Sequence, residues 1–170
     1  MFVTAALVVS ACGGPDVTDS ASGVSADSTT LTDKAADIEA VLLAVANGDQ
    51  LDFNSLRGHD VLLWFWAPWC TTCQREAAAV AEVQGIYGSD VIFVGVAGRD
   101  GLDPINRFID KYDVGAFDHI FDETGEIWDN FDIVTQPSFV FIDANGESSS
   151  HLGALGVDRL SERLDSLTSN

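Results

Sequence analysis

The stretch Trp66-Ala67-Pro68-Trp69-Cys70-Thr71-Thr72-Cys73 decides how this chain folds. It continues from Val61–Trp66, an unbroken apolar run that predicts a strand buried on both faces of a sheet. A helix is predicted from Cys70 to Gln84, with Gly85 as its stop. Cys70 is therefore expected at a helix N-terminus, where free backbone N–H groups and the helix dipole favour a negative charge such as a thiolate.

The two cysteines of this stretch are predicted to form a redox-active pair. Cys73 lies one helical turn after Cys70, within disulfide reach, and the thiolate is the form that attacks sulfur. A structural zinc site would need four ligands, but the only other cysteine is Cys12 and the histidines are scattered (His59, His119 and His151). An inert structural disulfide is the second alternative, although a two-residue loop stabilises a fold little.

The amino-acid composition indicates a single globular domain and argues against nucleic acid as a partner. The 170 residues, 46% of them apolar, suit one domain with a sizeable core and an appendage. The net charge of −19, with only eight Lys and Arg residues, disfavours nucleic-acid binding, which depends on neutralising phosphates. We predict no cofactor and no bound metal.

The first twelve residues are predicted to be a signal segment. The apolar stretch Phe2–Val9 is too short to cross a membrane and has the size of a signal-peptide core. The residues Val9-Ser10-Ala11-Cys12 resemble the lipobox of bacterial lipoproteins, which implies cleavage before Cys12 and lipidation of that cysteine. The pattern departs from that family because no Lys or Arg precedes Lys34. The alternative is an ordinary cysteine in a leader.

A linker and one domain are predicted to follow. Residues 13–35 are rich in Ser, Thr, Asp, Gly and Ala, which is typical of a flexible acidic tether. Residues 36–170 alternate strand and helix patterns, which favours an α/β fold with a mixed central sheet flanked by helices. An N-terminal hairpin is expected over residues 38–53, with Asn47-Gly48 in its turn. Further elements are predicted as strand 91–97, a helix capped by Asp103-Pro104, a short helix at 127–131, a hairpin over 138–152 and a helix over 157–167.

Over residues 36–168 the order of elements and the motifs resemble the thioredoxin superfamily. The Trp-Ala-Pro-Trp-Cys-x-x-Cys block carries the resemblance. Glu76, the Val94–Ala97 strand end and Gln136-Pro137-Ser138-Phe139 make it most similar to the extracytoplasmic TlpA, ResA and DsbE group, nearest the actinobacterial DsbE and DsbF type. Cytosolic thioredoxins have a buried aspartate six residues before the first cysteine, where this chain has Trp64.

The resemblance implies further site residues. Pro137 matches the cis-proline that faces the cysteine pair, and Gln136 would offer its backbone to a substrate peptide. Glu76, three residues after Cys73 on one helical face, is implied to shuttle the proton of Cys73, the alternative being a solvated surface charge. Trp66 and Trp69 would form an apolar platform around the sulfurs, with Trp69 contacting substrate, although either could be a plain core residue.

These observations predict an enzyme, a protein thiol–disulfide oxidoreductase, anchored outside the cytoplasm by lipidated Cys12. Cys70 is expected to be the exposed sulfur that forms the mixed disulfide with exported proteins, and Cys73 the buried partner. The nearer resemblance favours oxidation of these clients and implies a membrane redox partner. The alternative is reduction of client disulfides, as in cytochrome c maturation. A copper- or haem-delivery module is a weaker alternative, because the spacing is short and Met1 is the only methionine. A peroxiredoxin is disfavoured because Arg75 stands where its cysteine would lie.

Overall fold

The computed structural model describes residues 42–44 and 50–169. The predicted signal segment, the tether and Cys12 lie outside the described residues. Of the predicted N-terminal hairpin, strands β1 (Leu42–Ala44) and β2 (Gln50–Asp52) pair antiparallel. The turn between them is not described, so the hairpin as a whole stays a prediction. Among the described residues, no helix has the length and apolar content needed to cross a membrane.

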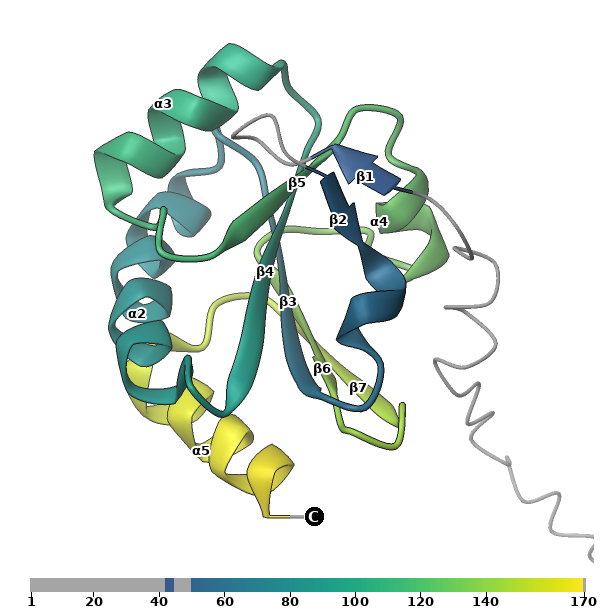
Figure 1. Ribbon diagram of the computed structural model, residues 1–170. Coiled ribbons are helices and arrows are strands. Elements are labelled where there is room, and N and C mark those ends of the chain that lie inside the picture. Colours follow the sequence, from purple (N-terminus) through teal and green to yellow (C-terminus); the bar gives the residue numbers. More distant parts are fainter. Residues whose placement is uncertain (1–41, 45–49, 170) are drawn as a thin grey trace, which may run out of the picture.

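Five strands form the central sheet, in the order β5-β4-β3-β6-β7 (Figure 1). Strand β3 lies in the middle and runs parallel to β4, which in turn runs parallel to β5, whereas β6 and β7 are antiparallel additions. The sheet is therefore mixed, as predicted. Its strands are β3 (Asp60–Trp66), β4 (Val91–Gly98), β5 (Asp118–Asp122), β6 (Ser138–Ile142) and β7 (Ser148–Leu152).

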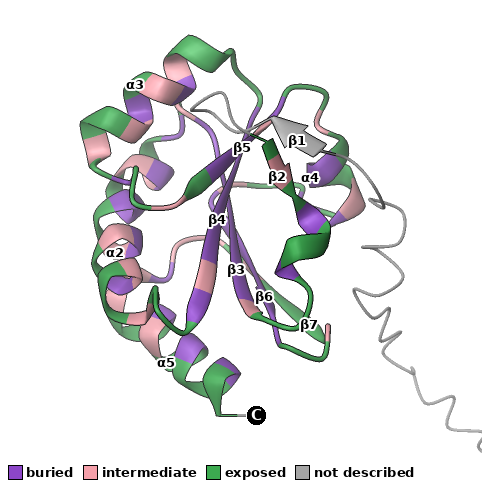
Figure 2. Cartoon of the chain, in the orientation of Figure 1, coloured by how far each residue is buried: buried purple, intermediate pink, exposed green. Residues whose placement is uncertain are grey.

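Helices cover both faces of the sheet because β3 sends alternate side chains to opposite sides. On one face, Leu62, Trp64 and Trp66 pack against α2, α3 and α5. On the other face, Val61, Leu63 and Phe65 pack against η1 and α4. Figure 2 shows the result, with β3 and β4 buried along almost their whole length. The helices are η1 (Phe53–Leu56), α2 (Thr71–Tyr87), α3 (Leu102–Tyr112), α4 (Glu126–Asn130) and α5 (Gly156–Thr168).

Three details differ from the sequence prediction. Helix α2 continues through Gly85 to Tyr87, whose hydroxyl donates to the Asp165 carboxylate of α5 at 2.6 Å, so a tertiary contact holds the last turn. Helix α3 is capped by Gly101, which places Asp103 inside its first turn. Strand β5 was not predicted from the sequence. It forms because it pairs with the end of β4.

Candidate active site

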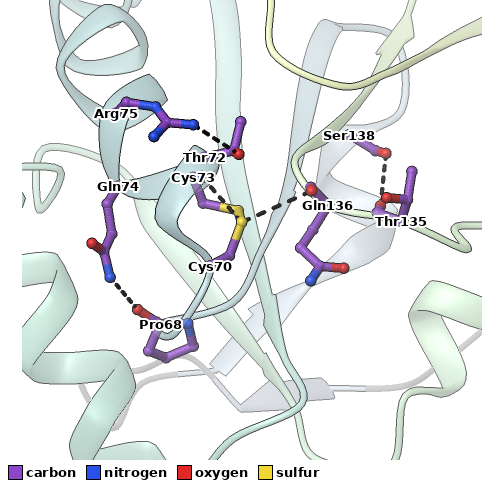
Figure 3. The surroundings of a disulfide bond; sticks show 9 residues. All are labelled: Pro68, Cys70, Thr72, Cys73, Gln74, Arg75, Thr135, Gln136 and Ser138. Carbon is purple, nitrogen blue, oxygen red and sulfur yellow. Dashed lines mark hydrogen bonds between the residues drawn. A yellow bond between two sulfur atoms is a disulfide. The ribbon is translucent and has the colours of Figure 1, made fainter.

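The cysteine pair lies where β3 gives way to α2, and it is a disulfide (Figure 3). Cys70 is the N-cap residue of α2, and its Sγ accepts the backbone N–H of Cys73 at 3.1 Å. The two Cα atoms are 5.2 Å apart, within the range of protein disulfides. No acidic residue stands in the first turn of α2, so nothing there opposes the pull of the helix dipole on a negative sulfur.

The two sulfurs differ in access, but less than the sequence suggested. Cys73 is 0% exposed, as predicted, and Cys70 is 7% exposed rather than openly accessible. The cap geometry explains the difference, because it turns the Cys70 side chain back toward the N–H of Cys73 and toward the Gln136 carbonyl oxygen, 3.8 Å from Sγ. Cys70 is still the only sulfur of the pair that solvent reaches.

Gln136 and Pro137 form the wall opposite the sulfurs. The Gln136–Pro137 peptide bond is cis, as the resemblance implied. Pro137 is buried, and its carbonyl oxygen accepts the N–H of Gly153 at 2.8 Å, which ties this loop to the end of β7. The Ser138 hydroxyl donates to the Thr135 carbonyl at 2.8 Å and braces the loop from the other side. The Gln136 backbone is thus held facing Cys70, whereas its pairing with a substrate peptide stays a prediction.

Glu76 is buried, so the alternative of a solvated surface charge is wrong. It is 5% exposed, one turn of α2 beyond Cys73. Its Oε1 accepts two backbone N–H groups, from Leu155 at 2.7 Å and Gly156 at 2.8 Å. These N–H groups belong to the N-terminus of α5, where a carboxylate is favoured. Glu76 therefore joins the helix that carries the cysteines to α5, a contact that sequence spacing could not reveal.

The three tryptophans around the motif have different environments. Trp64 and Trp66 are core residues that stack on each other with ring centroids 5.5 Å apart. Trp69, by contrast, is 52% exposed, and its Nε1 donates to the Arg99 carbonyl at 3.1 Å. Trp69 is therefore a fixed aromatic side chain at the surface beside Cys70, as a contact residue for substrate requires.

His119 on β5 is a buried polar residue of this region that the sequence did not single out. Its Nδ1 accepts the indole N–H of Trp66 at 3.2 Å, and its Nε2 lies 2.7 Å from the Val114 carbonyl. These partners select the tautomer with the proton on Nε2. Burial lowers the pKa of His119 to about 4, although the hydrogen bond to Val114 opposes the shift. The pairing of Gly95 with His119 across β4 and β5 makes room for the ring, which a Cβ at Gly95 would meet.

Metal ligands do not gather anywhere in the part of the chain that the structure describes: no three His, Cys, Asp or Glu side chains are placed to hold an ion.

Comparison with known proteins agrees with this geometry. Residues 31–147 match the AhpC/TSA family. The soluble secreted antigen MPT53 of Mycobacterium tuberculosis is 36% identical over 126 residues, which is 72% of each chain. The chain belongs to the AhpC/TSA family. The thiol–disulfide oxidoreductase ResA of Oceanobacillus iheyensis is 32% identical over 69% of this chain and 62% of that protein.

Solved structures of family members share the fold. The DsbF structure from M. tuberculosis, in mixed oxidised and reduced forms, has 38% identity and a TM-score of 0.71, covering 74% of this chain and 92% of that one. A secreted M. tuberculosis disulfide oxidoreductase homologous to DsbE has 34% identity and a TM-score of 0.70, with coverage of 74% and 94%. The fold is thus thioredoxin-like, and the chain is an extracytoplasmic thiol–disulfide oxidoreductase, as the sequence predicted.

Proposed function

We propose that this enzyme oxidises exported proteins through Cys70, and that a membrane redox partner then reoxidises the Cys70–Cys73 pair. The observation that carries the proposal is the position of the Cys70 sulfur, capping α2 and accepting the N–H of Cys73. These contacts stabilise a thiolate and hence the reduced pair. A stabilised reduced form makes a dithiol pair a stronger oxidant.

The exchange has two steps. A client thiolate attacks Cys70 Sγ, a mixed disulfide forms, and Cys73 leaves as a thiolate that takes up a proton. A second client thiolate then attacks the client sulfur of the mixed disulfide and releases Cys70 as a thiolate. The client loses two electrons and gains a disulfide, and the enzyme becomes a dithiol. During the first step, the Gln136 backbone beside the buried Pro137 would pair with the client segment, and Trp69 would cover it.

The direction of electron flow is tested by the reduction potential of the pair. We expect a value well above the roughly −270 mV of thioredoxin, toward the oxidising end of the superfamily near −120 mV. Equilibration with glutathione buffers, followed by tryptophan fluorescence, measures it. A potential at or below that of thioredoxin would instead favour the reductant function, as in cytochrome c maturation.

The roles of the two cysteines are tested separately. Cys70→Ala should abolish turnover, because Cys73, the remaining cysteine of the pair, is fully buried. In Cys73→Ala the Cys70 thiolate can still attack a client disulfide, but no second enzyme cysteine is present to resolve the product, so mixed disulfides should accumulate and appear after acid quenching and non-reducing electrophoresis. Full activity of the Cys70→Ala protein would contradict the mechanism.

We further propose that Glu76 carries the proton of Cys73. Its Oε1 is occupied by the two N–H groups of α5, and among the described residues no hydrogen bond engages Oε2, which is left for the proton. Glu76→Gln keeps a carbonyl oxygen for the N–H groups but cannot exchange a proton, whereas Glu76→Ala loses both. We expect the Gln variant to lose only the favourable interaction of the carboxylate charge with the N-terminus of α5, about 0.3–1 kcal/mol. Its exchange rate should fall most in the step in which the Cys73 thiolate takes up a proton. The Ala variant should also lose about 2–4 kcal/mol of stability, with two N–H groups left unpaired. Equal rates for wild type and the Gln variant across pH would reject the role.

Membrane anchoring completes the proposal. Lipidated Cys12 and the tether 13–35 would hold the domain outside the membrane within reach of its redox partner. Replacing Cys12 with Ser should move the protein from the membrane fraction to the soluble fraction. Unchanged partitioning would show that Cys12 is not the anchor.

A further inference from the structure

An open groove runs from the cysteine motif to α3. It has a volume of about 460 Å³, the size of a ligand or peptide pocket. Pro68 and Trp69, which immediately precede Cys70, form one end, and α3 forms the other. Both α2 and α3 lie on the same face of the sheet (Figure 1), and the groove begins at the two residues that precede Cys70 in the chain.

The floor of the groove is aromatic and fixed. Phe108 stacks on Trp66 with ring centroids 4.1 Å apart, and Tyr112 lies 4.6 Å from Phe108. At the mouth, the hydrogen bond from Trp69 to the Arg99 carbonyl holds an indole that is half exposed. Gln74 donates to the Pro68 carbonyl at 3.0 Å and fixes the remaining edge. Such preorganised aromatic surface binds a chain segment at little entropic cost.

The wall of the groove is cationic, unlike the rest of this protein. Arg107 and Lys111 line the groove. They are two of only eight Lys and Arg residues in a chain whose net charge is −19. They stand four residues apart on α3, on one helical face, and both are exposed. Neither has a carboxylate partner among the described residues, although Lys111 lies 4.9 Å from the Tyr112 ring. The one acidic lining residue, Asp100, accepts the N–H of Gly101 at 2.8 Å.

We propose that this groove selects clients in which an acidic and apolar segment flanks the reactive cysteine. The apolar side chain would lie on Trp69 and Tyr112, and the carboxylates would face Arg107 and Lys111 while the client sulfur reaches Cys70. Charge complementarity identifies this occupant, because exposed cations without partners attract an anionic chain and set its register. The inference rests on the proposed function and specifies its substrates.

The test uses two peptides that share a single cysteine and an aromatic residue. They differ only beside the cysteine, where one peptide has two Asp residues and the other has two Asn residues. Their rates of attack on the oxidised full chain are compared for wild type, Arg107→Gln/Lys111→Gln, and the control Arg57→Gln/Arg163→Gln. The control removes the same charge from exposed sites outside the groove. In the groove variant we expect an approximately 3- to 10-fold slower reaction with the Asp peptide and a change of less than about 1.5-fold with the Asn peptide. The control variant should react like wild type, and the difference should vanish near 1 M salt.

A charge reversal separates recognition from damage to the fold. Arg107→Glu/Lys111→Glu should prefer a Lys peptide over the Asp peptide, an inversion that misfolding cannot produce. Equal Asp-peptide rates for wild type and the groove variant, with exchange intact, overturn the groove proposal and leave the proposed function standing. A wild-type protein that exchanges with no peptide overturns both. A dimer that dissociates in the groove variant would assign the groove to a second copy, which also overturns the proposal.

Discussion

We predict that His119 makes the stability of the folded protein depend on pH, because its neutral imidazole is held between two fixed hydrogen-bond partners. The Trp66 indole donates to Nδ1 and the Val114 carbonyl accepts from Nε2, so a second proton would face the Trp66 N–H. Burial lowers the pKa of His119 from 6.5 to about 4. In the unfolded chain the imidazole returns to its ordinary pKa.

The sign of the effect follows from counting protons. Above pH 6.5 the residue is neutral in both states and contributes no pH dependence. As the pH falls from 6.5 to 4, the unfolded chain binds a proton that the folded protein does not, so the folded state loses about 1.4 kcal/mol per pH unit. The total loss is about 3 kcal/mol and is complete near pH 4, a large part of the stability of an ordinary domain.

The variant His119→Gln isolates this contribution. The glutamine amide can still donate to Val114 but cannot titrate, and the unpaired Trp66 N–H costs about 1–3 kcal/mol at every pH. Urea unfolding, followed by tryptophan fluorescence from pH 7.5 to 4, gives the stability of each protein. We expect the advantage of the wild type to shrink by about 3 kcal/mol across this range.

A matched control removes a surface imidazole. His59 is exposed, so His59→Gln should track the wild type. The carboxyl groups titrate in all three proteins and cancel in the difference, including Asp122, whose pKa burial raises. A stability difference between wild type and His119→Gln that stays constant from pH 7.5 to 4 would refute the reasoning.

Two further perturbations test contacts outside the sulfur chemistry. Gly95→Ala places a methyl group against the His119 ring and should cost about 1–3 kcal/mol in thermal or urea unfolding; an unchanged midpoint would mean that the ring is not so closely packed. The Tyr87 hydroxyl donates to Asp165, and this hydrogen bond raises the pKa of the tyrosine. Asp165→Asn should therefore lower that pKa in an ultraviolet titration of the phenolate. An unaltered titration curve would show that the hydrogen bond to Asp165 does not raise the pKa of Tyr87.

The sequence predicts those parts of the fold in which local pattern and tertiary environment agree. Strands β3 and β4 are unbroken apolar runs because both faces of the sheet are covered. Strand β5 carries His119 and Asp122 at buried positions, so it lacks the apolar pattern of a strand and depends on pairing with β4. The burial of Glu76 was equally beyond local inference, since its partners lie 79 and 80 residues further along the chain.

The same contrast between local and distant contributions applies to the electrostatics of the site. The net charge of −19 opposes the approach of a client thiolate and the formation of a thiolate at Cys70. At physiological salt, however, charges more than about 8 Å away are largely screened at the surface. The electrostatic environment of the Cys70 sulfur is then set mainly by its immediate neighbours, which are the Cys73 N–H and the N-terminus of α2. Arg107 and Lys111 extend this favourable region along the groove that a client would follow. In the proposed mechanism an acidic protein can therefore carry out thiol–disulfide exchange, because the few groups that favour negative charge lie beside the reacting sulfur and along the groove.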